Sequence, residues 1–489
     1  MPELNRKIQK YISRSQVTVY QLAKNTGLDR TMIQKMIKGT KYPGVKFFYK
    51  FCDALMLNRD EREELIQLFR IEKEGYSRYQ SRREIGDLLT SMQNVPEEYE
   101  HQREISIIIP DLPPIDGRSV EVKGKHNVRL FMYAFLQDQI REKAVDDIYM
   151  DVCSWTHNIM KKIYHYLVDG AGADGTGNVV IHQQVMLSYV NTQSESTFEN
   201  IITMRKILPS VFMFGKHYRV RFAYVNNARD ESIYVPFRHY LLGKDRLFLF
   251  NEEGDRGISI TDPVFIQGYR REVLEIEAKS RPLFRYTDHL AQAAELMREL
   301  NQNYRLVASY GVTPGISLFA SAGNSAVPGG EAARVLYWEA GEKLVRAMED
   351  PDFIQIYGTA GMEKFVKEGI FPPPADWYLS GMQTEERIAV IHAYTDFLRE
   401  SRSSYLLKNE KSAANIFSGF GIRLFAPNRI LISQSAPGIP RGLLLLEENS
   451  MFENFLDYFR SLIEYEEVYL PREGAEQFCK IMDKYISEL

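Results

Sequence analysis

Apolar residues recur at helical spacing through the first seventy residues of the chain. The stripe formed by Leu4, Ile8, Tyr11 and Ile12 predicts a first helix. Two further helices are expected at about 47–56 and 60–70, where large apolar side chains would close a small core: Phe48, Phe51, Leu55, Leu65 and Leu68. The pattern predicts a helical domain over residues 1–72.

Between these helices the sequence indicates two more, joined by a tight turn. Thr18 can cap a helix that runs to about Thr26. Asp29 can cap a helix of about nine residues, which Gly39 would end. Gly27 lies between the two and can adopt the left-handed backbone conformation that a sharp turn needs. Helix, turn and helix in this order predict a helix-turn-helix.

Helical and strand patterns alternate through the rest of the chain. Residues 75–92 are helical and charged, and residues 106–117 contain three prolines, so 73–117 is expected to be a helical connector and linker. The glycine-rich stretch 169–178 is expected to be a flexible surface loop, and it lacks the lysine of a phosphate-binding loop. Helices are expected at 128–143 and 197–207, and strands at 147–153 and 218–226. This alternation predicts a layered α/β architecture.

Two distant stretches, 243–273 and 427–462, have the same order of predicted elements, namely strand, turn, strand and helix. The helix caps are expected to be Asp262, followed by Pro263, and Ser450. Short segments also match: Arg246-Leu-Phe-Leu with Arg429-Ile-Leu-Ile, and Arg256-Gly-Ile with Arg441-Gly-Leu. An internal repeat is therefore predicted, with α/β lobes at 118–290 and 291–489, related by a pseudo-twofold axis around a cleft. Two unrelated hairpin–helix units are the alternative.

Length and composition are those of an ordinary globular protein. At 489 residues the chain is too long for one hydrophobic core, so a multidomain fold is expected, an α domain followed by α/β lobes. No apolar run is long enough for a transmembrane helix, and the polar first ten residues lack the apolar region of a signal peptide. The three widely spaced cysteines predict no disulfide framework and a cytoplasmic location.

The net charge of −4 conceals a strong asymmetry. Residues 1–50 contain eleven Lys or Arg and two acidic residues, Glu3 and Asp29, which gives +9. The remaining residues therefore carry −13, the difference between −4 and +9. A basic end on an acidic protein is typical of a module that binds a polyanion, although a solvated basic face gives the same composition.

The spacing of residues in the first segment resembles that of lambda-repressor-like (XRE-type) DNA-binding domains, which also contain five helices. The matching positions are Leu22-Ala23, Gly27-Leu28, Ile33, Gly39 and Pro43. The sequence differs from the family at Val19, where a glutamine that contacts phosphate is frequent, and at Ile37, where a glutamate is frequent. The resemblance implies that the third helix enters the major groove of double-stranded DNA and that a homodimer binds two half-sites.

The resemblance also assigns roles to side chains. Four residues near the start of the third helix would read base edges: Arg30, Thr31, Gln34 and Lys35. Three residues further along would hold phosphates, which position the protein: Lys38, Lys41 and Tyr42. Thr18, at the start of the second helix, completes the expected DNA-binding set. Core or inner-face positions are expected for Met32, Ile33, Met36 and Ile37.

Two α/β lobes in one chain also resemble the phospholipase-D-like fold, which serves as an effector region in some transcription regulators. Active members of that family need, in each lobe, a histidine followed two residues later by a lysine. None of the nine histidines here has that neighbour: Leu241 takes its place after His239, and no histidine follows His392. Zinc-protease, thiol-redox, hydrolase and nucleotide-binding motifs are absent as well, so no enzymatic activity, metal or cofactor is expected.

The sequence therefore predicts a DNA-binding transcription regulator whose α/β region senses a small-molecule or peptide effector, mediates homodimerisation, or does both. No membrane partner is expected. One alternative is an enzyme of unknown type fused to a DNA-targeting helix-turn-helix module. Another is an interaction protein that uses the helical domain as a docking surface. Such a protein would show no salt-sensitive DNA binding.

Overall fold

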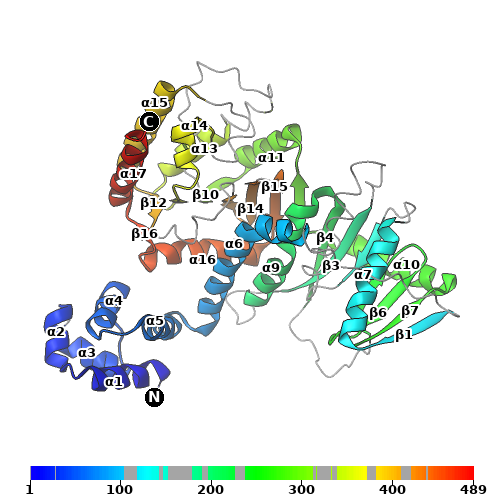
Figure 1. Ribbon diagram of the computed structural model, residues 1–489, viewed down its shortest axis with the longest axis horizontal. Coiled ribbons are helices and arrows are strands. Elements are labelled where there is room, and N and C mark those ends of the chain that lie inside the picture. The colour runs from blue at the N-terminus through cyan, green and yellow to red at the C-terminus, as the bar shows by residue number, and fades with distance from the viewer. Residues whose placement is uncertain are drawn as a thin grey trace.

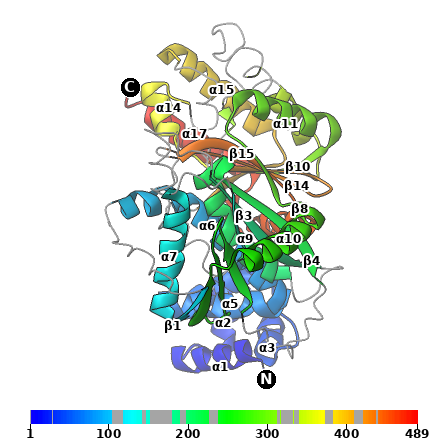
Figure 2. The same cartoon turned by 90° about the vertical axis from the view of Figure 1, so that its right-hand side faces the viewer.

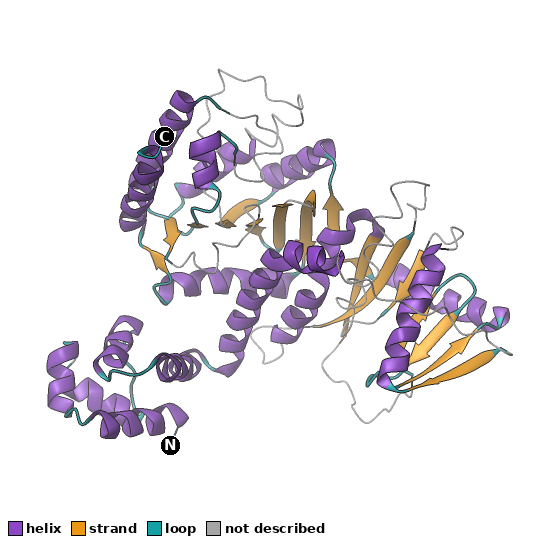
Figure 3. Cartoon of the chain, viewed as in Figure 1, coloured by secondary structure: helices purple, strands orange, loops and turns teal. Residues whose placement is uncertain are grey.

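The computed structural model describes residues 2–27, 29–103, 118–141, 147–151, 179–189, 197–225, 237–311, 315–316, 332, 339–371, 382–408, 420–436 and 439–489. The predicted domain boundary at 106–117 and the predicted loop at 169–178 lie outside these residues. Figures 1 and 3 show a helical region at the N-terminus, followed by two lobes in which helices cover β-sheets. This order confirms the predicted combination of an α region with a mixed-sheet α/β region.

The N-terminal helical region consists of α1 (Glu3–Ser15), α2 (Val19–Thr26), α3 (Arg30–Lys38), α4 (Val45–Ala54) and α5 (Arg59–Glu74). Local capping explains where α2 begins and where α2 and α3 end. Asp29 precedes α3 as predicted, but its side chain accepts no capping hydrogen bond, so the predicted cap is not formed. The Thr18 hydroxyl accepts a hydrogen bond from the Gln21 backbone N–H at 3.2 Å, and the Gln21 side chain accepts one from the Thr18 N–H at 2.9 Å. Gly27 and Gly39 end the two helices in the left-handed conformation, with φ of 69° and 72°. The predicted helix, turn and helix are all present.

Gly75 separates α5 from α6 (Tyr76–Arg103), the helix that joins the N-terminal helical region to the lobes. The sequence predicts a charged connector here, and α6 is helical, but one of its faces is fully buried: Ile85, Leu88, Leu89 and Met92. These side chains belong to an extended apolar core that also contains residues of both sheets. Helix α6 is therefore anchored in the body of the protein.

The first lobe is built on a mixed sheet with the strand order β1-β7-β6-β5-β2-β3-β4-β8. Its strands are β1 (Ser119–Lys123), β2 (Asp147–Met150), β3 (Val180–Ser188), β4 (Tyr218–Val225), β5 (His239–Leu242), β6 (Leu247–Phe250), β7 (Arg256–Ile260) and β8 (Arg281–Pro282). Its helices are α7 (Lys125–Arg141), α9 (Thr197–Phe214), the short 3-10 turn η1 (Gly215–His217) and α10 (Pro263–Lys279).

The second lobe is built on a sheet with the strand order β16-β12-β11-β10-β13-β14-β15-β9. Its strands are β9 (Phe284–Thr287), β10 (Arg305–Gly311), β11 (Ile354–Tyr357), β12 (Ser404–Leu407), β13 (Phe420–Ala426), β14 (Arg429–Ala436), β15 (Ile439–Glu447) and β16 (Val468–Tyr469). Its helices are α11 (Leu290–Asn303), α13 (Ala340–Met348), α14 (Met362–Glu368), α15 (Thr384–Glu400), α16 (Asn449–Glu464) and α17 (Pro471–Ile486).

The two sheets have the same strand order. Adding eight to each strand number of the first sheet gives the order of the second sheet when that order is read from β9 to β16. The parallel pairs β2–β3 and β3–β4 correspond to β10–β11 and β11–β12, and the antiparallel pairs correspond in the same way. The matching segments of sequence fall in β6 and β14 and in β7 and β15, except that Arg246 directly precedes β6. A Cβ on Gly257 would meet the Phe248 ring at 2.5 Å, and one on Gly442 would meet the Tyr286 ring at 2.6 Å, so both glycines make room for an aromatic side chain. The strand order bears out the predicted internal repeat.

The lobes meet through different faces of this repeated unit. In the first lobe, α7 and α9 cover the face of the sheet that is turned toward the second lobe, here called the inward face. Helix α10 covers the opposite, outward face. In the second lobe, α16, the counterpart of α10, lies on the face turned toward the first lobe. Helices α11, α13, α14, α15 and α17 lie on the opposite face, and Figure 2 shows α11, α14, α15 and α17 there. A pseudo-twofold axis would bring equivalent faces together, so the prediction of pseudo-twofold lobes around a cleft is wrong. Apolar side chains of α6, α9 and α16 pack between the sheets instead.

Two local predictions are also corrected. The cap of α16 is Glu448, not Ser450, because the Glu448 carboxylate accepts hydrogen bonds from the Met451 N–H at 2.8 Å and from the Ser450 hydroxyl at 2.6 Å. Helix α9 does not end near residue 207 but continues through Pro209 to Phe214. Its last turn is buried in the core, and that burial outweighs the cost of an internal proline.

Candidate nucleic-acid interface

Helix α3 presents a polar face to solvent and an apolar face to the core. Ile33 and Met36 are fully buried, and Met32 and Ile37 are half-buried. The exposed side chains include the four predicted base readers and the first predicted phosphate contact: Arg30, Thr31, Gln34, Lys35 and Lys38. Apolar residues at helical spacing keep the two faces apart. The fold thus gathers these five side chains on one exposed helix.

The end of α3 is held by Asn5 from α1, a residue that sequence patterns did not single out. The buried Asn5 side chain donates to the Met36 carbonyl at 2.6 Å and accepts from the Tyr42 hydroxyl at 2.9 Å. A Cβ on Gly39 would approach the Asn5 side-chain oxygen to 3.0 Å, so glycine also makes room for this contact. Because the half-buried Tyr42 uses its hydroxyl within the fold, it acts first as part of the support for α3.

The remaining predicted residues flank α3. Lys41 is exposed in the segment after α3, and Thr18 is exposed at the start of α2. The Thr18 hydroxyl already accepts the Gln21 N–H, which leaves its own proton to bond the Gln21 side-chain oxygen at 3.0 Å. Both residues lie on the surface of the N-terminal helical region, and Thr18 is engaged in capping.

Charge is distributed unevenly over this region. On the side formed by α1 and α5, Lys7 pairs with Glu64 at 2.7 Å and Arg14 pairs with Glu61 at 2.6 Å. The hydrogen bond from Arg14 lowers the pKa of Glu61 to about 2, so this carboxylate stays charged. Eight other exposed cations of residues 1–50 form no ion pair with any described residue: Lys10, Lys24, Arg30, Lys35, Lys38, Lys41, Lys46 and Lys50. The unpaired positive charge includes all the cations of α3.

A second polar cluster lies at the carboxyl end of β2, where the neighbouring strands β3 and β5 run in opposite directions. His239 has Asp151 at 3.5 Å on one ring nitrogen and Glu252 at 3.1 Å on the other. Arg238 pairs with Glu252 at 3.0 Å. Burial opposes charge on the imidazole, but the two carboxylates outweigh it and raise the pKa of His239 above its ordinary value. Ligands of open α/β sheets bind at such strand ends.

Neither a metal site nor a membrane-spanning helix is found in the described part of the chain. No three His, Cys, Asp or Glu side chains there gather as metal ligands would. No helix among these residues is both long and apolar enough to cross a membrane.

Comparisons with known proteins add little to this geometry. No protein-family model matches the chain, and no curated protein matches it. Among solved structures, the chain is similar to TrmBL2, an archaeal chromatin protein described as showing a novel mode of DNA binding. The identity is 12%, the match covers 57% of this chain and 100% of the other, and the TM-score is 0.22. A TM-score this low supports no conclusion about this chain, so its function is argued from its own residues.

Proposed function

We propose that this chain is a sequence-specific DNA-binding transcription regulator that reads the major groove with α3. The observation that carries the proposal is the exposed row of Arg30, Gln34 and Lys35 on a helix whose opposite face is buried. Arginine and lysine match the acceptors of guanine, and glutamine matches the donor and acceptor of adenine. A helix of about 10–12 Å in diameter fits a major groove about 12 Å wide.

The lambda-repressor-like spacing of Gly27 and Gly39 supports the same role. The two glycines fix the turn before α3 and its end, so α3 is held at a set angle to α2. One such helix reads too few bases for useful specificity, so we propose a homodimer on two half-sites.

The two α/β lobes serve, in this proposal, as the region that senses an effector and contributes to dimerisation. An effector between the lobes would have to displace apolar side chains of α6, α9 and α16. The cluster of Asp151, His239 and Glu252 at a strand end is the better candidate for a small polar effector. Without a lysine two residues after His239 we propose no phosphodiesterase activity.

The proposal is tested by selection from a random duplex library with the full-length protein, followed by binding measurements on the enriched sequence. We expect one recurrent motif, and an affinity that falls as salt rises because bound counterions are released. Lys364→Ala, which removes an exposed lysine of α14, is the charge control for variants of the α3 cations and should bind DNA like the wild type. Absence of a motif together with salt-independent binding would show that the helical region is not a DNA-binding domain.

A further inference from the structure

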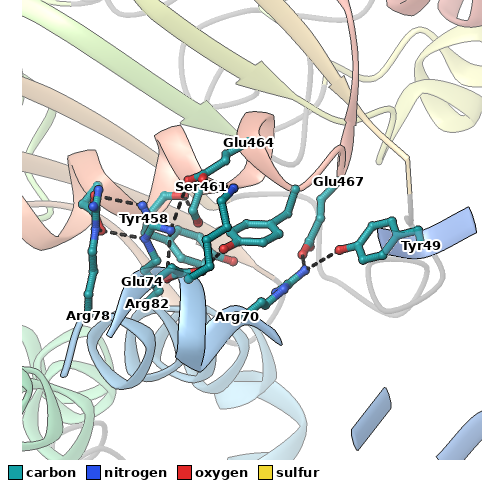
Figure 4. Close-up of polar contacts among 12 residues, drawn as sticks. Tyr49, Arg70, Glu74, Arg78, Arg82, Tyr458, Ser461, Glu464 and Glu467 are labelled. Atoms are coloured by element: carbon teal, nitrogen blue, oxygen red, sulfur yellow. Dashed lines mark hydrogen bonds and ion pairs between the residues drawn. The ribbon is translucent and has the colours of Figure 1, made fainter. Parts of the chain in front are cut away.

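The C-terminal end of α16 is joined to the N-terminal helical region by a dense set of polar contacts (Figure 4). Arg70 of α5 pairs with Glu467 at 2.7 Å, and Lys73 of α5 pairs with Glu464 at 2.7 Å. The Arg70 side chain also donates to the Tyr49 hydroxyl of α4 at 3.2 Å. Residues nearly 400 positions apart in the sequence thus meet at one surface.

Tyr465, the residue directly after α16, is inserted into the N-terminal helical region. Its side chain is 3% exposed and belongs to the same buried core as Phe48, Phe51 and Phe69. The guanidinium of Arg70 lies 4.2 Å from the centroid of the Tyr465 ring, and the Tyr465 hydroxyl bonds the Glu74 carboxylate. A residue of the second lobe therefore completes the core of the first seventy residues.

Arg82 of α6 connects a carboxylate of α5 with two carboxylates of α16. It is 7% exposed and lies 2.8 Å from Glu74, 2.7 Å from Asp457 and 3.3 Å from Glu464. Arg78, one turn earlier, donates from Nε to both carboxylate oxygens of Asp457 at 3.1 and 3.2 Å, and its Nη2 donates to one of them. Because the guanidinium of Arg82 is buried, removal of one of its carboxylate partners would strongly destabilise the folded protein.

The charges of this network balance. Four cations, Arg70, Lys73, Arg78 and Arg82, face four carboxylates, Glu74, Asp457, Glu464 and Glu467. Burial opposes ionisation of Asp457 and Glu464, but hydrogen bonds and charges from the facing cations outweigh it and lower the pKa of both groups. Both carboxylates are therefore charged near neutral pH, and the network holds together there.

We propose that the end of α16, from Asp457 to Glu467, is a lock that fixes the N-terminal helical region on the α/β body. Gly75 has a φ of 83°, and no atom of a described residue lies within 4 Å of the place where a Cβ would stand, so α5 could otherwise swing relative to α6. Because α16 also packs against α6 and the second sheet, a shift of α16 changes the position of the helical region. The proposal stands whether or not that region binds DNA.

Charge exchange across the Arg70–Glu467 pair tests the lock in the full-length protein. Arg70→Glu and Glu467→Arg each place like charges together, and the double variant restores an opposite pair that Tyr49 can still bond. Chymotrypsin cleavage after the exposed Tyr76 reports opening at Gly75, and small-angle scattering reports the separation of the parts. Glu299→Arg is the matched control. Glu299 forms a similar exposed ion pair with Arg285, with 2.9 Å between their charged groups, and this pair lies outside the junction.

We expect each single variant to be cleaved about tenfold faster or more and to have a larger radius of gyration. The double variant should restore part of both values, because it regains the ion pair but not the contact of the Arg70 guanidinium with the Tyr465 ring. Tyr465→Ala should open the junction without any change of charge. Wild-type cleavage and scattering in both single variants and in Tyr465→Ala would overturn the proposal, as would a double variant no better than the singles. The control should behave like the wild type, and far-ultraviolet circular dichroism confirms that each variant is folded.

Discussion

Arg30→Ala and Lys38→Ala should weaken DNA binding in two different ways, although both residues are exposed cations of α3. Arg30 is the first residue of the helix, where side chains reach base edges. Losing that contact should cost about 1–3 kcal/mol on the cognate site, or roughly 5- to 150-fold in affinity, and little on random DNA. Lys38 is the last residue of the helix and should contact a phosphate, so its loss should weaken both duplexes alike.

The size of the salt effect follows from the number of unpaired cations. Lys38 and Lys41, the two cations expected to hold phosphates, form no ion pair with a described residue. If each neutralises one phosphate, log K falls with log salt at a slope of about −1.8, twice about −0.9. Binding should then weaken roughly 12-fold between about 50 and 200 mM salt, and Lys38→Ala should flatten the slope by about 0.9.

Fluorescence anisotropy with cognate and scrambled duplexes at several salt concentrations measures both quantities. Arg30→Lys is an informative partner variant, because it keeps the charge but loses the bidentate geometry that reads guanine. It should retain the salt slope and lose specificity. Equal, salt-independent losses for Arg30→Ala and Lys38→Ala would refute the groove-reading arrangement, and unchanged binding in both would leave α3 as a solvated face.

Three further predictions concern stability. Thr18→Ala removes the oxygen that caps α2 and should lower stability by about 1 kcal/mol in urea unfolding, whereas Thr18→Ser should not; equal midpoints for both would contradict the cap. Asp457 and Glu464 have lowered pKa values, so the α16 lock should be fully formed above about pH 4 and lost only as pH falls through the folded values, seen as expansion in scattering; opening near neutral pH would be inconsistent with this. The pKa of His239 is raised above 6.5, so its contribution to the free energy of unfolding should be complete below that pH and should decline as pH rises through the pKa of the folded state. The melting temperature of the wild type should show this decline, and that of His239→Gln should lack it.

Local features of the fold could be predicted from the sequence because their causes lie within a few residues. The cap at Thr18 sets the start of α2, and the left-handed glycines at 27 and 39 set the ends of α2 and α3, all through local contacts. The same holds for α10, where Asp262 accepts the N–H groups of Val264 and Phe265 and Pro263 begins the helix. The repeat was predictable because the equivalent strands β6 and β14, and β7 and β15, keep similar short runs of sequence.

Features determined by distant contacts could not be predicted in this way. Asn5 supports α3 across 31 residues, and nothing in its neighbourhood distinguishes it from a surface asparagine. Tyr465 follows an amphipathic helix and resembles an ordinary cap residue, yet it completes a core that lies nearly 400 residues earlier. The acidic run around Glu464 and Glu467 is common in solvated helices, and only the facing arginines give it a structural role.

The unequal packing of the two lobes explains why the second lobe, rather than the first, contacts the N-terminal helical region. The counterparts α10 and α16 occupy the same place in the repeat, but α10 lies on the outside and exposes Val264 and Phe265. Helix α16 lies inside, with Phe455 and Phe459 fully buried against α6 and the second sheet. Its apolar residues are used for the core, and its acidic end is left to meet the basic residues of α5 and α6. Any force that separates the lobes must therefore act on α16, and through Tyr465 on the helices that carry α3.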